Sequence, residues 1–140
     1  MTADLFDFLR ARLDEQAAAA VSAGGTGEVW RALGTGVYSA ATAEDDVPPL
    51  VTAGPEVGGS DEDAARAEHI ALHGPAQVLR QVEATRGLLE RYTASGTGAE
   101  LPDVSHRSAD DVHRMAVDMV VRHLAQAHAD HPDHRPEWRP

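Results

Sequence analysis

The sequence contains no cysteine, no lysine and no long apolar run. Without cysteine the chain can form neither disulfides nor thiolate metal sites, and it has no cysteine nucleophile. No apolar run approaches the roughly 18 residues of a membrane-spanning helix, and the start of the chain lacks the basic-then-apolar pattern of a secretory signal. These absences predict a cytoplasmic protein that does not enter a membrane.

Positive charge is also scarce. All 12 cationic side chains are arginine, against 23 aspartates and glutamates, and the formal net charge is −11. Proteins bind nucleic acid largely by placing clustered lysines and arginines on phosphates, and no such cluster occurs here. We therefore expect no direct binding to DNA or RNA, whereas a basic protein surface would suit this charge.

Large apolar side chains are few as well. Apolar residues make up 42% of the 140, but 25 of them are alanine and only 27 are valine, leucine, isoleucine or phenylalanine. The length predicts a single domain over residues 1–140. Because the core material is so thin, we expect a partner protein or a second copy of the chain, as in a homodimer, to complete it.

The regular elements that are present predict an α+β fold. Residues 1–23 have the apolar spacing of an amphipathic helix, interrupted by Arg12. Residues 28–53 predict a short antiparallel hairpin, which turns at Gly34-Thr35-Gly36, or a three-strand sheet with a last strand near 50–53. Trp30 lies on the first strand, on the face opposite Val29, Arg31 and Leu33.

Residues 60–128 predict helices. A capping-box-like start at Ser60 opens a helix that Gly74 ends, and Pro75 opens the next one, so the two form a helical hairpin. Gly87 costs a helix about 1 kcal/mol relative to alanine, which indicates close packing there. A polar loop over 93–107 then leads to the last helix.

The last helix has the clearest apolar periodicity in the chain, and His123 lies on its stripe, which predicts a core or interface histidine rather than a metal ligand. The stripe consists of Val112, Met115, Ala116, Met119, Val120, His123 and Leu124. The irregular tail over 129–140 contains three prolines and cannot continue the helix. Trp138 in this tail is expected to dock on the body of the protein.

Histidine placement is the only hint of site chemistry. His69 and His73 lie one helical turn apart, and His128, His131 and His134 recur every third residue. If the tail folds back over Gly74-Pro75, then His69, His73 and His131 could hold zinc. However, helix-end histidines commonly cap carbonyls, and Ile70 stands where zinc-protease helices carry glutamate. We favour this second interpretation, so we expect no cofactor and no catalytic residue.

Several stretches resemble a small family of unknown function from actinobacteria and their phages. They are 8–15 (FLRARLDE), Trp30, 67–84 (AEHIALHGPAQVLRQVEA) and 129–140 (ADHPDHRPEWRP), together about half of the chain. Two features depart from that family: Thr26-Gly27-Glu28-Val29 stands where Pro-Gly-Pro precedes the tryptophan, and the segment after Tyr92 lacks a Cys/His-containing insert. The resemblance implies no activity, but it implies that His69, His73, His131 and Trp138 belong to the sequence stretches that recur in the family.

The sequence thus predicts a small acidic accessory protein, related to phages or prophages, that acts by binding another protein without catalysis. Trp30, Gly74, Pro75 and Trp138 are the residues expected to serve structure or interaction. One alternative is a histidine metal-binding protein, in its extreme form a metal-dependent hydrolase. A second alternative is an acidic DNA mimic that inhibits a DNA-binding enzyme.

Overall fold

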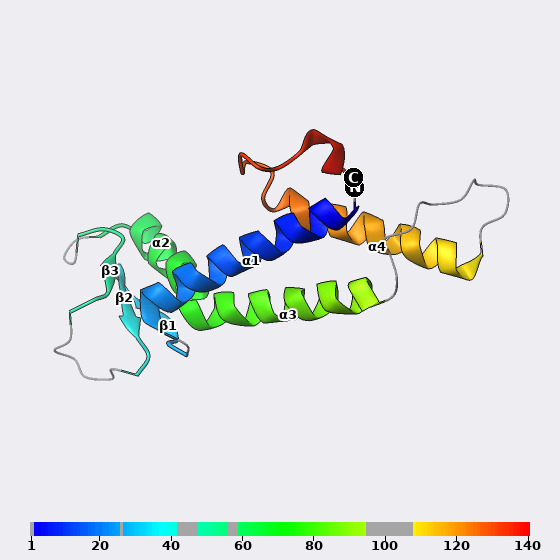
Figure 1. Ribbon diagram of the computed structural model, residues 1–140. Coiled ribbons are helices and arrows are strands. Elements are labelled where there is room, and N and C mark those ends of the chain that lie inside the picture. The colour runs from blue at the N-terminus through cyan, green and yellow to red at the C-terminus, as the bar shows by residue number, and fades with distance from the viewer. Residues whose placement is uncertain (1, 26, 42–47, 56–58, 95–107) are drawn as a thin grey trace. The chain divides into compact units, whose positions relative to one another are not determined.

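The computed structural model describes residues 2–25, 27–41, 48–55, 59–94 and 108–140 (Figure 1). The predicted loop at 93–107 falls almost entirely outside these residues. Within them the predicted α+β class is confirmed. The elements in chain order are α1 (Thr2–Gly24), β1 (Trp30–Leu33), β2 (Gly36–Ser39), β3 (Val51–Thr52), α2 (Asp61–Leu72), α3 (Pro75–Ala94), α4 (Ala109–Gln126) and the 3₁₀ turn η2 (Pro136–Trp138).

The contacts divide the chain into two compact units. One comprises residues 16–82, here called the sheet unit, and the other comprises 1–15 and 83–140, here called the tail unit. The prediction of one domain over 1–140 concerns how these units are joined, and it stays a prediction. Each unit is described by itself below.

The sheet unit contains the predicted three-strand antiparallel sheet, in the order β1-β2-β3. Trp30 pairs with Ser39 and Val37 with Val51 across the two ladders. The β1–β2 turn needs a left-handed residue, and Gly34 supplies it with φ 58°. Helix α2 packs on β1 and β2, as Figure 1 shows, and buries Ala67 completely. The sheet is therefore stabilised by one small-residue helix face, as a sheet this short requires.

The corner between α2 and α3 is built on Trp30. Ser60 opens α2 with a capping box, since its hydroxyl accepts from the Asp63 N–H and the Asp63 carboxylate accepts from the Ser60 N–H. At the other end Gly74 does not adopt a positive φ. A Cβ at Gly74 would lie 3.1 Å from the Trp30 Cβ and 3.2 Å from the Ala71 carbonyl oxygen. Glycine is needed here for close packing rather than for a left-handed cap.

Helix α3 buries Val82 and Leu89. The close packing predicted at Gly87 is wrong within the described part of the chain, where no neighbouring atom lies within 4 Å of a Cβ built there. This glycine weakens the helix without any packing contact that requires it.

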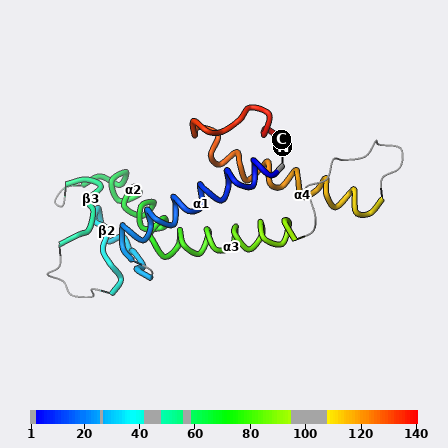
Figure 2. The backbone as a smooth tube through the Cα atoms, in the orientation of Figure 1, coloured from blue at the N-terminus to red at the C-terminus, as the bar shows by residue number. Residues whose placement is uncertain are grey.

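In the tail unit, α1 buries the predicted apolar face, including Leu5, Leu9 and Leu13. Arg12, which interrupts that face in the sequence, is buried as well, with 7% of its surface exposed. The C-terminal tail runs back along the first half of α1 (Figure 2), and Trp138, 2% exposed, lies 4.8 Å from Phe8 between ring centroids. This is the docking expected of Trp138.

The apolar stripe predicted for the last helix is not the face that the chain buries. The buried residues of α4 are Asp111, Val117, Val121 and Ala125. Val112 and Met119 of the predicted stripe are 58% and 56% exposed. His123 is exposed too, and its Nδ1 lies 2.8 Å from the Met119 carbonyl oxygen. Periodicity located an apolar face correctly but could not show whether this chain or another would cover it.

None of the described helices is both long enough and apolar enough to cross a membrane.

Candidate functional site

The structure brings together two of the three predicted metal ligands. His69 and His73 lie at the end of α2 with ring centroids 4.6 Å apart, and both side chains are exposed. They belong to the sheet unit, whereas His131 belongs to the tail unit, where it contacts Arg12 and Phe8. Among the described residues no group of three or more histidine, aspartate or glutamate side chains is placed to hold a metal ion. The three-histidine zinc site stays a prediction.

Two further predicted residues of the sheet unit, Trp30 and Pro75, line a cleft of about 400 Å³. Trp30, His73 and Pro75 meet there with small residues from the second half of α1 and with Gln81. The Trp30 Nε1 atom is buried and has no hydrogen-bond partner among the described residues. Within the sheet unit Gly74 packs on Trp30. Within the tail unit the C-terminal tail lies along the first half of α1. Packing of the tail over the Gly74-Pro75 corner stays a prediction.

The tail unit holds a denser cluster, centred on Phe8. The rings of His128, His131 and His134 lie 6.2, 5.9 and 5.8 Å from the Phe8 ring, all edge-on. The Arg12 guanidinium lies 5.2 Å from the same ring. With Trp138, these side chains surround Phe8, which is only 7% exposed. We call Phe8, Arg12, His128, His131, His134 and Trp138 the tail cluster.

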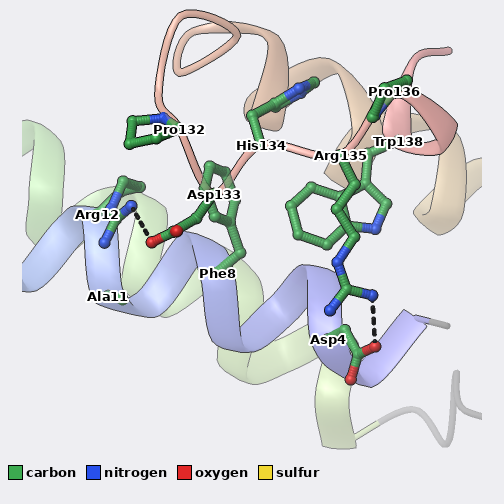
Figure 3. A pocket seen from close by; sticks show the side chains of 10 residues that line it. All are labelled: Asp4, Phe8, Ala11, Arg12, Pro132, Asp133, His134, Arg135, Pro136 and Trp138. Carbon is green, nitrogen blue, oxygen red and sulfur yellow. Dashed lines mark hydrogen bonds and ion pairs between the residues drawn. The ribbon is translucent and has the colours of Figure 1, made fainter.

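A cleft of about 460 Å³ opens beside the tail cluster (Figure 3). Its charged lining is internally paired: Arg135 contacts Asp4 at 2.9 Å, and Arg12 lies 3.5 Å from Asp133 and 2.7 Å from Glu15. The Arg135 guanidinium also stacks 5.3 Å from the Trp138 ring. Among the residues that the structure describes, those lining the cleft include no serine, threonine or cysteine. The charged side chains at this cleft therefore contact one another within the tail unit.

One group in the tail cluster has a shifted pKa. Burial holds the pKa of His128 below its usual value of 6.5, and the nearby Arg12 charge lowers it further. His131 and His134 act in the same direction, whereas Glu15 opposes the shift. The neutral imidazole of His128 is therefore the form that the folded cluster favours.

The three-residue spacing of the histidines is visible in the sequence, but their convergence on Phe8 is not. In the sequence, Phe8 is one apolar residue of an amphipathic helix, and Arg12 only interrupts the apolar face of that helix. The signal that could have found them is the pairing of an arginine on an apolar stripe with a histidine-rich tail, since a buried guanidinium needs polar neighbours. Nothing in the spacing says which helix receives the tail.

Comparison with known proteins identifies the family. The chain matches a family of unknown function, DUF6221, over residues 2–140. The chain belongs to this family. Because the match covers nearly the whole chain, the DUF6221 region includes both the tail cluster and the α2–α3 corner. No curated protein and no solved structure matches the chain.

Proposed function

We propose that this DUF6221 chain is a small cytoplasmic accessory protein, related to phages or prophages, that acts by binding protein and not by catalysis. The partner is a second copy of the chain, bound through the exposed apolar face of α4. We call this face the outer stripe. It consists of Val112, Met115, Ala116, Met119 and Val120.

The orientation of α4 is the observation that carries this proposal. One side of the helix is buried and consists of Val117, Val121 and Ala125 with Asp111, which bonds to Arg114. The outer stripe lies on another side of the helix, where Val112 and Met119 are 58% and 56% exposed and Met115 and Val120 are partly exposed. A surface helix normally carries one apolar face, turned inward, so a second apolar face is unusual. A partly exposed apolar face of this kind is typical of an interaction surface.

The charge distribution favours a second copy as the occupant. A chain of net charge −11 repels another copy at most places on its surface, but the outer stripe itself carries no charged side chain. Two copies related by a two-fold axis would present the same stripe to each other, so no carboxylate is buried at its centre. Ala116 lies within the stripe and permits a close approach of the two helices.

The size of the stripe sets the expected affinity. A single helix face covers less than the roughly 800 Å² per partner of a standard interface. We therefore expect a dissociation constant of about 1 µM or weaker. Light scattering should accordingly be measured up to about 100 µM protein, where such a dimer is well populated.

The absence of cysteine makes a clean cross-linking test possible. In the Met119→Cys variant, mild oxidation should form an intermolecular disulfide at least about tenfold faster than in a Leu72→Cys control, because the interface raises the local thiol concentration. Leu72 is 70% exposed on α2 and lies outside the stripe. Equal rates for the two variants would contradict the proposal.

A substitution that places a charge on the outer stripe tests the same surface without cross-linking. Met119→Arg should return the particle mass to the 14.9 kDa monomer, whereas Leu72→Arg should keep the mass of the unaltered protein. Both substitutions make the net charge less negative, so general repulsion cannot explain a difference between them. A 14.9 kDa mass for the unaltered protein at every concentration overturns the homodimer.

The His69–His73 pair supports a second candidate, a metal-binding function. Two exposed imidazoles with centroids 4.6 Å apart on one helix face can serve as two ligands of a zinc ion. Metal analysis of untagged protein, with His73→Ala as the comparison, decides it: stoichiometric zinc that disappears in the variant supports the site, and zinc unaffected by the substitution ends it. The acidic DNA-mimic alternative would appear as salt-sensitive competition with DNA for a DNA-binding enzyme.

A further inference from the structure

Close contacts fix the walls of the cleft in the sheet unit. A Cβ at Gly24 would lie 2.9 Å from Cγ of Pro75, so the end of α1 meets the start of α3 with no room for a side chain between them. The Ala76 N–H donates to the Glu28 carbonyl at 3.1 Å, which ties the start of α3 to the segment before β1. All these residues belong to one unit, and the cleft is therefore pre-formed, as small-molecule sites usually are.

The cleft has an apolar floor and a polar rim. In its lining Ala20 and Pro75 are buried and Trp30 is partly exposed. The polar side chains of the lining are all exposed, and each can donate and accept hydrogen bonds. They are Gln16, His73 and Gln81. Sites for small molecules share this anatomy, and a volume of about 400 Å³ lies within their usual range.

The lining is also free of fixed charge. Among the residues that the structure describes, those around this cleft include no aspartate, glutamate or arginine. Charged residues make up 25% of the chain, so an uncharged concave surface is unusual on a molecule of net charge −11. An ionic ligand would lose water here without gaining an opposite charge. The cleft therefore selects for uncharged ligands.

We infer that this cleft binds a small uncharged molecule that combines a flat ring with an amide-like edge. The ring packs against Trp30 and Pro75, because an indole ring favours stacking with flat apolar groups. The amide-like edge bonds to the Gln16 carboxamide, which offers a donor and an acceptor side by side. The cleft lies in the sheet unit, so this inference does not depend on the outer stripe of α4.

Benzamide is a suitable probe, because it has a flat ring, an amide and no charge. Benzoate has the same shape with a carboxylate in place of the amide, so it is the matched control. For a ligand of this size we expect a dissociation constant of about 1 mM for benzamide. Benzoate should bind at least about tenfold more weakly, because the lining holds no cation to pair with it. Salt at about 0.3 M screens the general repulsion between benzoate and the acidic chain.

The indole N–H signals in a proton–nitrogen NMR spectrum locate the bound probe in the full chain. The chain has two tryptophans, and a Trp138→Phe variant assigns their two signals. The Trp30 signal should move as benzamide is added to about 10 mM, where a site of this affinity is mostly filled. The Trp138 signal should stay in place, because that ring lies in the tail unit.

Filling the cleft distinguishes this site from general binding. Ala19 lines the cleft and is exposed on α1, so Ala19→Phe should fold and weaken benzamide binding at least about tenfold. Ala18→Phe is the matched control, because Ala18 is also exposed on the same helix but lies outside the lining. Ala23→Phe fills the same cleft from another exposed position of the lining, and it decides if Ala19→Phe does not fold.

Four results would overturn the inference. One is a Trp30 signal that does not move at the highest benzamide concentration, and another is an equal movement of both tryptophan signals. Equal affinity for benzamide and benzoate would show that the cleft does not select uncharged ligands. Benzamide binding that survives in the folded cleft-filling variants would place the probe elsewhere on the protein.

Discussion

Replacing Arg12 with methionine tests what holds the buried guanidinium in place. Arg12 is 8% exposed at its side chain, donates to Glu15 and His131, and lies over Phe8. Its Nε is buried and has no acceptor among the described residues. Methionine keeps an unbranched apolar stem of similar reach and contacts aromatic rings favourably. The substitution therefore removes the charge and its hydrogen bonds while preserving most of the packing.

The free energy lost with the contacts of Arg12 is similar in size to the free energy gained by no longer burying its charge. The lost bond to His131 is worth about 1.5–3 kcal/mol and the contact with Phe8 about 1 kcal/mol. The pairs with Glu15 and Asp133, whose carboxylates are 60% and 72% exposed, add less than about 1 kcal/mol. On the other side, methionine relieves several kcal/mol of guanidinium dehydration, including about 1–3 kcal/mol for the unpaired Nε. We expect Arg12→Met to fold with a stability within about 1 kcal/mol of the unaltered protein.

Urea unfolding at pH 7.5, followed by circular dichroism, measures this stability. Arg12→Ala is the matched comparison, because it also removes the stem that covers Phe8. It should lower the free energy of unfolding by about 2–3 kcal/mol more than Arg12→Met does. If Arg12→Met is as destabilised as Arg12→Ala, the polar contacts outweigh the dehydration and the reasoning fails.

Gly74, between α2 and α3, and Gly87, within α3, should respond to alanine substitution in opposite directions. Gly87→Ala should raise the free energy of unfolding by about 0.5–1 kcal/mol, seen as a melting temperature about 3 °C higher, because the added Cβ enters open space on a helix. Gly74→Ala should lower it by about 1–3 kcal/mol, because the added Cβ meets the Trp30 Cβ at 3.1 Å and a carbonyl oxygen at 3.2 Å. A destabilised Gly87→Ala or a neutral Gly74→Ala, measured in the same melting experiment, would show that these contacts are misread.

Local signals predicted the elements well because their causes are local. The capping box at Ser60 and the proline at position 75 fix helix starts through bonds and dihedrals within four residues. The two-residue turn after Leu33 fixes the hairpin register in the same way. The thin core and acidic surface likewise follow from composition alone.

The tertiary structure decided which faces meet. A stripe with helical period is apolar whether its own chain or another covers it, so the sequence could not foresee that α4 would bury Val117 and expose Met119. The same holds for the histidines. Their spacing places His69 beside His73, but only the return of the tail along α1 sets His131 against Arg12. Periodicity encodes a residue's neighbours along the helix, whereas burial depends on contacts between segments far apart in the sequence.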